Sequence, residues 1–258
     1  MNNLLKKVLR RYLDILYEDM CKERYSTQKQ IVEHNPSAII LDCGCRIGDS
    51  TNILAEPIGT RNLIGLDLNF GSLLQANQRG INAVQSDLNH NIPMTENFID
   101  VIIATDVIEH LTDPARFVKE MYRVLKPGGY IILDTPNLAS WHNIFALIMG
   151  VQPFSGPNIT SMEDSDVEIV RQMHRATHGL SEEGEFQEHD EQELTRHLVV
   201  IAYKSLINLL MNVGFKIEKA FGFGYYPLPP FLAHIFQRLD TRHTHHLLIK
   251  ARKAMIRY

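Results

Sequence analysis

The sequence predicts an α/β fold in which a mostly parallel β-sheet carries helices on both faces. Short apolar runs alternate with stretches of helical periodicity over residues 38–134. The first run, Ile39–Leu41, ends in Asp42 and leads into a loop that contains Gly44 and Gly48. Residues without a β-carbon allow left-handed backbone angles and the close approach of a ligand at such a turn. Alternation of strand and helix is typical of parallel sheets, because parallel strands need helix-sized crossovers.

The composition bounds the class of protein. The 258 residues are enough for one large core, 45% of them are apolar, and the formal charge of -4 gives no nucleic-acid signature. Cys21, Cys43 and Cys45 form neither a disulfide ladder nor a C-x-x-C metal pair, so a reducing compartment, the cytoplasm, is expected. No signal peptide is visible, and no apolar run approaches the roughly 20 residues that span a bilayer.

An N-terminal helical segment is predicted over residues 1–35, with the helix itself at 2–34. Apolar residues recur there at three- and four-residue steps: Leu5, Val8, Leu9, Tyr12, Leu13, Leu16 and Tyr17. This spacing favours a helix that packs one face on the core. The basic residues of its polar face leave an amphipathic membrane-surface helix as the alternative, which Asp14, Glu18 and Asp19 weaken.

The core, residues 36–258, alternates predicted strands and helices. Strands are expected at 38–42, 62–67, 83–86, 100–104, 130–134, 215–221 and 246–251. Helices are expected from Ser50 onward and at 73–78, 114–125 and 200–213, and Pro114 suits the first turn of its helix. The tetrapeptide Lys126-Pro127-Gly128-Gly129 is a helix stop followed by a turn. The expected architecture is therefore a doubly wound, seven-stranded, mostly parallel sheet.

Two insertions, at about 137–197 and 222–243, interrupt this alternation and are predicted to form a helical cap or lid. The first is too long for an ordinary connection, which takes about 2–6 residues. Within it, residues 161–195 hold eleven carboxylates and only two arginines. Bulky apolar and aromatic residues gather at 138–154 and 221–236. They either pack on each other as a cap core or wall a pocket for an apolar acceptor.

Carboxylates follow four successive strands of the predicted sheet. Asp42 ends the first strand, Asp67 ends the second, Asp87 follows the third and Asp106 follows the fourth. In an open parallel sheet, ligands bind beyond the carboxyl ends of the strands. An acid at the end of the second strand can accept hydrogen bonds from two ribose hydroxyls, and the pair Asp87-Leu88 can take an adenine amine and pack its ring. Each aspartate alone could equally be a surface cap or turn residue.

Together these segments resemble the class I S-adenosylmethionine-dependent methyltransferases, in the methyltransferase type 11 subgroup that includes ubiquinone-pathway O-methyltransferases. The resemblance runs over residues 30–137. It rests on Leu41-Asp42-Cys43-Gly44-Cys45-Arg46-Ile47-Gly48, Gly65-Leu66-Asp67-Leu68, Ser86-Asp87-Leu88, residues 100–111 and Arg123-Val124-Leu125-Lys126-Pro127-Gly128-Gly129. It implies a Rossmann-like fold, with S-adenosylmethionine as the cofactor and S-adenosylhomocysteine as its product.

The resemblance also implies roles for the matched positions. The methionine part of the cofactor would lie against Asp42, Gly44, Cys45, Arg46 and Gly48, the ribose against Asp67 and Leu68, the adenine against Asp87 and Leu88, and the methyl side near Thr105 and Asp106. Arg46 departs from the family, which usually has glycine at this position. We hypothesise that its cation binds the carboxylate of the cofactor.

Catalytic groups are less defined. Histidines that could remove a proton from an acceptor are His110, His142, His174, His178 and His197, although each could equally be a packing or surface residue. None is singled out. No metal is expected. The alternative is that Asp106, Glu109 and His110, at i, i+3 and i+4, share a helical face as metal ligands, against a purely structural hydrogen-bonding role.

The predicted function is methyl transfer to a small molecule, at oxygen, on a sugar, lipid-linked or natural-product acceptor. An NAD-dependent oxidoreductase and a non-catalytic S-adenosylmethionine-binding module are the alternatives. Nucleic acid is not expected as the acceptor, because Thr105-Asp106-Val107-Ile108 replaces the Asn/Asp-Pro-Pro-aromatic element of amine methyltransferases and no Pro-Cys nucleophile is present. No transmembrane segment is expected, and peripheral membrane contact is left open.

Overall fold

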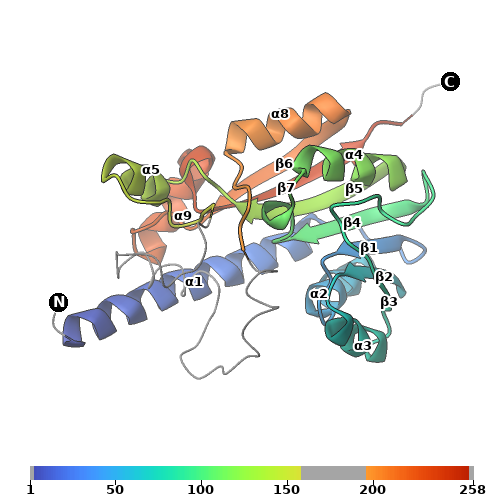
Figure 1. Ribbon diagram of the computed structural model, residues 1–258, viewed down its shortest axis with the longest axis horizontal. Coiled ribbons are helices and arrows are strands. Elements are labelled where there is room, and N and C mark those ends of the chain that lie inside the picture. Colours follow the sequence, from blue (N-terminus) through green and yellow to red (C-terminus); the bar gives the residue numbers. More distant parts are fainter. Residues whose placement is uncertain (1–2, 158–195, 256–258) are drawn as a thin grey trace. The chain divides into compact units, whose positions relative to one another are not determined.

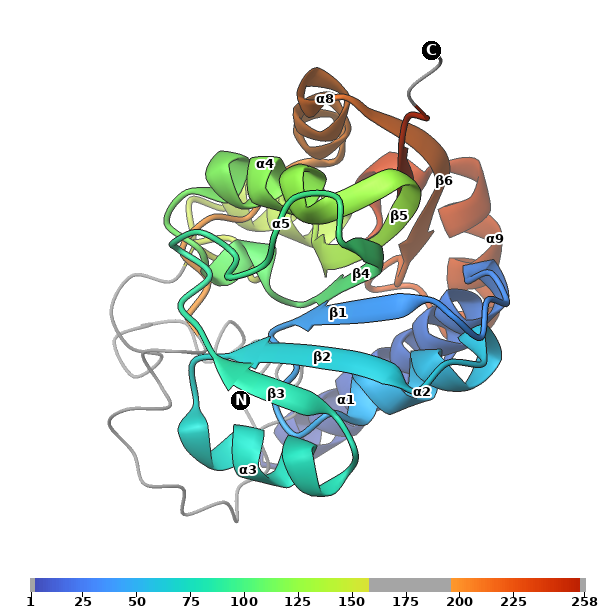
Figure 2. The same ribbon diagram turned by 90° about the vertical axis from the view of Figure 1, so that its right-hand side faces the viewer.

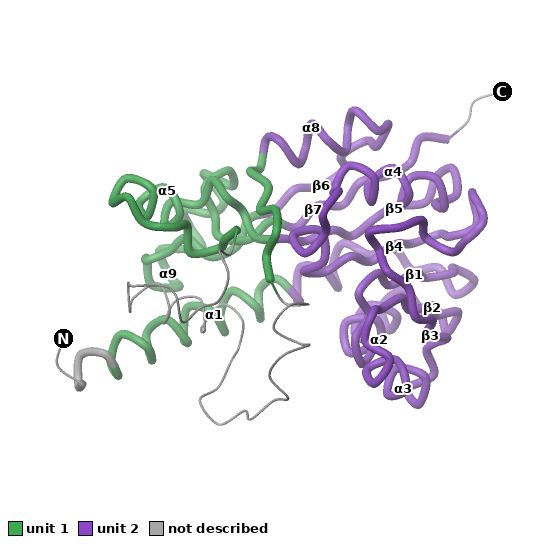
Figure 3. Tube along the Cα trace, in the orientation of Figure 1, with its two compact units in different colours: residues 1–24, 136–203, 222–247 green, residues 25–135, 204–221, 248–258 purple. Residues whose placement is uncertain are grey.

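The structure is a computed structural model that describes residues 3–157 and 196–255. The chain forms two compact units, shown in Figure 3. Unit 1 consists of residues 1–24, 136–203 and 222–247, and unit 2 consists of residues 25–135, 204–221 and 248–258. The predicted cap at 137–197 stays a prediction, because most of that segment lies outside the described residues.

A seven-stranded sheet has the order β3-β2-β1-β4-β5-β7-β6. Its strands are β1 Ile39–Cys43, β2 Asn62–Asp67, β3 Asn82–Gln85, β4 Ile99–Thr105, β5 Leu125–Pro136, β6 Phe215–Phe223 and β7 His246–Lys253. The first five strands pair in parallel. The predicted α/β class with seven strands is therefore confirmed.

The helices are α1 Asn3–Ile31, α2 Asp49–Ile58, α3 Phe70–Gln78, α4 Pro114–Val124, α5 Trp141–Ile148, α8 Tyr203–Val213 and α9 Pro230–Leu239, with 3-10 turns η1 Ile108–His110 and η3 Thr241–His243. Within unit 2, α2 and α3 lie on one face of the sheet, and α4 and α8 lie on the other (Figures 1 and 2). Helix α4 begins where Asp113 accepts a hydrogen bond from the Arg116 N–H and Pro114 occupies the first turn.

The core of unit 2 is the centre of the sheet. Ile40 and Leu41 of β1 and Ile102 and Ile103 of β4 are fully buried, and β5 buries its run from Tyr130 onward. Parallel strands that are covered on both faces read as continuous apolar runs, which is why the sequence marked them clearly. The carboxyl ends of β1 to β5 meet at one edge, where the predicted site residues gather.

Helix α1 buries an apolar stripe. Leu13, Leu16 and Met20, at three- and four-residue steps, are all buried. This agrees with the packing helix that the periodicity predicted, although the helix ends at Ile31 rather than at residue 34. Within the described residues, none of the helices combines the length and the apolar character that crossing a bilayer requires.

Two elements differ from the prediction. The Lys126–Gly129 turn lies inside β5 as a bulge, because Ile99 pairs with Leu125 and Val101 already pairs with Tyr130. The chain leaves and rejoins the strand through Gly128 at φ 84°. The second insertion was predicted as part of a helical cap with no helix bounds of its own, and it contains helix α9, which begins directly after Pro229.

Candidate functional site

The loop between β1 and α2 depends on two glycines. Gly44 and Gly48 have left-handed φ angles of 77° and 87°. A β-carbon at Gly44 would lie 2.5 Å from Cγ2 of Val107, and one at Gly48 would lie 2.2 Å from Cδ1 of Ile81. Both positions therefore require glycine, because the φ angle is left-handed and there is no room for a β-carbon. The backbone N–H of Gly44 donates to the Leu66 carbonyl at 2.7 Å, which ties the loop to the end of β2.

Arg46 also has a left-handed backbone, with φ 47°. This conformation is unfavourable for a residue with a β-carbon, which gives a physical reason for the glycine that the family usually has here. Its side chain is exposed. Its backbone N–H donates to Oδ2 of Asp67 at 2.8 Å. The unusual residue is thus part of the joint between the loop and β2.

Asp67 is the last residue of β2 and is held from two sides. Oδ2 accepts from the Arg46 N–H, and Oδ1 accepts from the Asn69 N–H at 2.9 Å. A carboxylate offers about four acceptor positions on its two oxygens. Each oxygen of Asp67 therefore keeps a second acceptor position beyond these two bonds, in a side chain that is only partly buried.

Asp42, by contrast, lies inside the core. Its side chain is 2% exposed, and Oδ2 accepts a hydrogen bond from Oγ1 of Thr51 at 2.5 Å. Burial raises the pKa of Asp42 to about 7, with the negative charges of Asp67 and Asp134 adding to the rise and the Thr51 bond opposing it. The bond between Asp42 in β1 and Thr51 in α2 thus joins the two ends of the loop. The sequence did not indicate this role for Thr51.

A second buried carboxylate, Asp134, was also missed by the sequence analysis. It ends the predicted fifth strand, so the same strand-end signal was available. Nε2 of Gln28 donates to Oδ2 of Asp134, and the Asp106 N–H donates to Oδ1 at 3.2 Å. Gln28 also lies 3.5 Å from Oγ1 of Thr105. Thr105 and Asp106 are therefore brought together with Asp134, and Asp106 has a left-handed φ of 52°.

Asp87 and Leu88 form a separate turn after β3. Oδ1 of Asp87 accepts from the Asn89 N–H at 2.8 Å, and Oδ2 lies 3.1 Å from Nδ1 of His90. Leu88 is buried. Leu68, which follows Asp67, has an exposed side chain, and its carbonyl accepts from Nε2 of Gln85.

Arg79 is a further positioning residue that no sequence signal indicated. Its guanidinium donates to the Ile47 carbonyl at 3.1 Å and forms an ion pair with Asp49. The side chain at the end of α3 thereby holds the second half of the β1–α2 loop, next to Gly48. A surface ion pair contributes little alone, but the carbonyl bond fixes a backbone that has no helix or strand partner.

The α-helical face expected for the metal alternative, Asp106, Glu109 and His110, does not form. Asp106 precedes a three-residue 3-10 turn that contains Glu109 and His110, so the three residues do not share an α-helical face. Glu109 is fully buried, and its Oε2 accepts from Oγ1 of Thr135 at 2.9 Å. Glu109 therefore has the structural hydrogen bond that the other interpretation expected.

The histidines proposed as bases differ in burial, and two of them lie outside the described residues. His178, like His174, lies outside the described residues, and His110 is half-buried. His197 is buried, and its Nδ1 bonds the Ser155 carbonyl at 2.6 Å. Burial lowers the pKa of His142 to about 3, so this ring is neutral at ordinary pH. Nε2 of His142 lies 3.0 Å from Nδ1 of His245.

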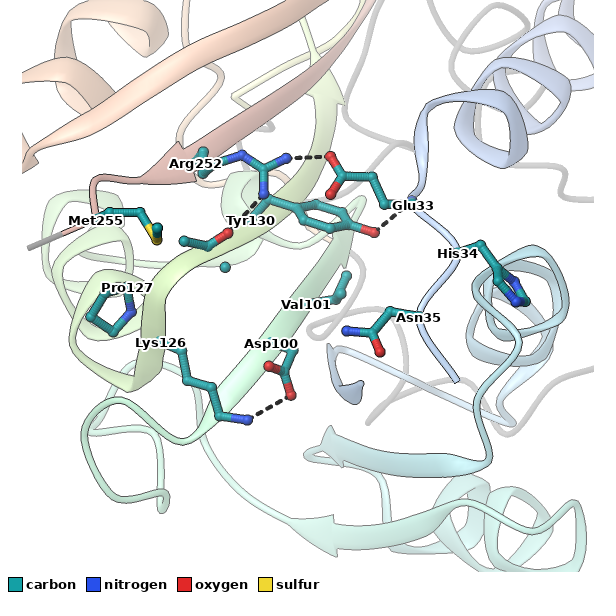
Figure 4. A pocket seen from close by; sticks show the side chains of 12 residues that line it. Glu33, His34, Asn35, Asp100, Val101, Lys126, Pro127, Tyr130, Arg252 and Met255 are labelled. Atoms are coloured by element: carbon teal, nitrogen blue, oxygen red, sulfur yellow. Dashed lines mark hydrogen bonds and ion pairs between the residues drawn. The ribbon is translucent and has the colours of Figure 1, made fainter. Parts of the chain in front are cut away.

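A pocket of about 440 Å³ lies at the other edge of unit 2, near the amino ends of β4 and β5. Its charged groups are paired, as Figure 4 shows: Lys126 with Asp100 at 2.8 Å, and Arg252 with Glu33. Arg252 also donates to the Gly128 carbonyl at 2.7 Å. None of the predicted site residues lines this pocket, and its ion pairs join β5 to β4 and β7 to the segment that follows α1.

Comparisons with known proteins match the part of the chain that holds the β1–α2 loop, Asp67 and Asp87. Residues 41–133 match the methyltransferase domain family. A probable S-adenosylmethionine-dependent methyltransferase of Mycolicibacterium smegmatis is 34% identical over 102 residues, which are 38% of this chain and 38% of the relative. A malonyl-[acyl-carrier protein] O-methyltransferase of Marinomonas is 30% identical over 43% of this chain and 42% of the relative. The chain thus spans well under half the length of these two relatives.

Solved structures share the fold. An S-adenosylmethionine-dependent methyltransferase from Mesorhizobium loti superposes with a TM-score of 0.57 at 18% identity, over 88% of this chain and 96% of the other. At that identity, the likeness shows the fold alone. The matched family covers the β1–α2 loop, Asp67, Asp87 and β4, which are the elements of the site. Residues 41–133 thus match a methyltransferase domain, and the relatives that share this part of the chain include a probable S-adenosylmethionine-dependent methyltransferase.

Proposed function

We propose that this chain transfers a methyl group from S-adenosylmethionine to a small-molecule acceptor, at an oxygen atom. One observation carries the proposal. The carboxylate at the end of β2, Asp67, is fixed by the N–H groups of Arg46 and Asn69 and sits beside a left-handed glycine loop. This joint combines a preset hydrogen-bond acceptor with a backbone that a ligand can approach closely.

The described residues fit the cofactor. The second acceptor position on each oxygen of Asp67 suits the two hydroxyls of a ribose. The loop with Gly44 and Gly48 would hold the methionine part, with Thr105 nearby in the network of Gln28 and Asp134. Asp87 would take the adenine amine, and Leu88 would pack the ring. The exposed guanidinium of Arg46 would meet the carboxylate of the cofactor.

When bound, S-adenosylmethionine supplies a methyl group that its sulfonium already activates. The task of the chain is then to orient the donor and the acceptor and to exclude water. We assign no general base. With a pKa of about 3, His142 is a weak base. It could remove a proton only from an acceptor whose own hydroxyl is unusually acidic.

The acceptor is proposed to be apolar or lipid-linked. The Marinomonas relative is named as an O-methyltransferase, which supports oxygen as the methylated atom. Unit 1 exposes large apolar side chains on α5 and α9, which supports an apolar acceptor. The wider class of proposed acceptors includes hydroxyl groups of sugars and natural products.

Thermal unfolding with two ligands tests the proposal. S-adenosylhomocysteine should raise the melting temperature, because it binds only the folded chain, whereas NAD should leave it unchanged. A rise with NAD alone would assign the fold to an oxidoreductase. Transfer of labelled methyl from S-adenosylmethionine to an extract of lipids and small molecules then tests catalysis. Binding without any transfer would favour a non-catalytic module.

A further inference from the structure

Helix α9 of unit 1 is inverted in polarity. Its buried positions include Gln237, whose Nε2 donates to Glu23 at 2.7 Å and whose Oε1 accepts from the Gly224 N–H at 3.2 Å. Nε2 of His234 lies 2.8 Å from Oδ2 of Asp19. The polar side chains of this helix thus face α1 and the chain before α9. A helix on an ordinary protein surface buries its apolar face instead.

The apolar residues of α9 point outward. Phe231, Ile235 and Leu239, spaced by four residues, form one stripe, and Leu239 is 78% exposed. Phe236 beside the stripe is exposed as well. Large apolar side chains that gather in this way on a monomer mark a surface that contacts an apolar partner.

Helix α5 of the same unit repeats the pattern. Its buried residues include His142 and Asn143, and Asn143 donates to the Asn137 carbonyl at 3.0 Å. Its exposed apolar residues are Trp141, Phe145, Leu147 and Ile148, and Met149 directly after the helix is exposed as well. Of these, Trp141, Phe145 and Ile148 follow helical spacing and lie on one face.

The two stripes meet at Tyr225. Its hydroxyl accepts a hydrogen bond from Nε1 of Trp141 at 2.5 Å, and its ring stacks on Phe236 with centroids 5.6 Å apart. Figure 3 shows both helices within unit 1. The apolar face, defined here as the exposed apolar residues of α5 and α9, is therefore continuous through Trp141, Tyr225 and Phe236.

The charges around this face fit an anionic partner. Residues 138–157 and 220–237 contain no Asp, Glu, Lys or Arg. Arg238 at the end of α9 and Arg242 in η3 are exposed, and no ion pair engages either guanidinium within residues 3–157 and 196–255. Asp240 between them is held inward by Tyr225 at 2.8 Å and by His243 at 2.8 Å. The face thus offers apolar bulk with cations at one end.

We propose that the apolar face of α5 and α9 docks on the surface of an anionic lipid bilayer. Apolar and aromatic side chains enter the boundary between headgroups and acyl chains, and the arginines reach the phosphates. Trp141, with its apolar body and bonded N–H, suits that boundary. A second copy of the chain would also cover apolar surface, but the unpaired cations at the edge favour an anionic lipid.

Sedimentation with vesicles tests the docking surface on the full-length chain. Wild-type protein should sediment with equimolar phosphatidylcholine–phosphatidylglycerol vesicles about tenfold more strongly than with phosphatidylcholine alone. Ile235→Glu with Leu239→Glu should lose this binding. Arg238→Gln with Arg242→Gln should lose the preference for the anionic lipid and keep the weak binding to phosphatidylcholine.

Met211→Glu is the matched control, because Met211 on α8 is 56% exposed but lies outside the apolar face. It should bind vesicles like wild type. Failure of wild type to bind either vesicle would overturn the proposal, as would full binding by the Ile235/Leu239 variant. Wild-type self-association that this variant abolishes would assign the face to a second copy. Binding of S-adenosylhomocysteine by every variant shows that folding and the proposed function are intact, independent of the lipid result.

Discussion

Asp42 should make the stability of the protein fall as the pH rises from about 4 to 7. In the unfolded chain an aspartate titrates near 3.9, whereas burial raises the pKa of Asp42 to about 7 in the folded protein. Between these values the folded state holds a proton that the unfolded state has lost. Stability therefore decreases with pH in that window and levels off above it.

Asp42→Asn removes this dependence, since asparagine resembles the protonated carboxyl. Each pH unit of separation between the two pKa values corresponds to ~1.4 kcal/mol. The free energy of unfolding of Asp42→Asn relative to wild type should consequently grow by ~2–3 kcal/mol between about pH 5 and pH 8.5. A constant packing cost of the amide would shift both values equally and leave this difference unchanged.

Urea unfolding at the two pH values measures the effect. Thr51→Val is the matched control, because the Thr51 hydroxyl favours the charged carboxylate through its bond to Oδ2. It should destabilise the protein more at pH 8.5 than at pH 5, opposite in sign to Asp42→Asn. If Asp42→Asn changes stability by the same amount at both pH values, then Asp42 is not a buried carboxylate with a raised pKa.

Four further substitutions test the loop and the residues that hold it. Gly48→Ala should lower the free energy of unfolding by ~2–3 kcal/mol, because the added β-carbon would clash with Ile81 and the backbone has a left-handed φ of 87°. An unchanged urea midpoint would contradict this prediction. Arg46→Gly should raise the free energy of unfolding by ~1 kcal/mol, because glycine adopts the left-handed backbone without strain. Arg46→Ala should weaken S-adenosylhomocysteine binding severalfold. Unchanged affinity of Arg46→Ala in calorimetry would remove Arg46 from the site. Gln28→Leu should cost ~2–3 kcal/mol by removing one hydrogen-bond donor from the buried Asp134, and a neutral result in the same unfolding assay would refute the network.

Much of the fold could be predicted because its signals are local. Apolar runs and glycine turns mark β1, β2 and β4 to within a residue or so of their observed ends. The bounds of helix α9 within the predicted cap could not be read from the sequence, for two physical reasons. Pro229-Pro230 is typical of turns, although proline is also favoured in the first turn of a helix. The helix also buries polar groups and exposes apolar ones, so its periodicity does not follow the usual pattern.

The site was predictable only in part. Asp67 and the glycine loop could be read from strand ends, whereas their contact through the Arg46 N–H required the folded backbone. The bond from Gln28 to Asp134 joins residues 106 positions apart, and no local pattern indicates it. The expected helical face at Asp106 failed because a 3-10 turn forms there instead. Long-range hydrogen bonds and short-turn geometry therefore account for the errors.

Calorimetric titration with S-adenosylhomocysteine, on wild type and Asp67→Asn, tests the central claim most directly. Wild type should bind, and Asp67→Asn should bind about 30-fold more weakly, because one carboxylate oxygen that accepts a ribose hydroxyl becomes an amide. Asp113→Asn, which keeps a capping side chain on α4, should bind like wild type. No binding by wild type, or equal affinity for Asp67→Asn, would contradict the assignment of the β2 carboxylate to the cofactor.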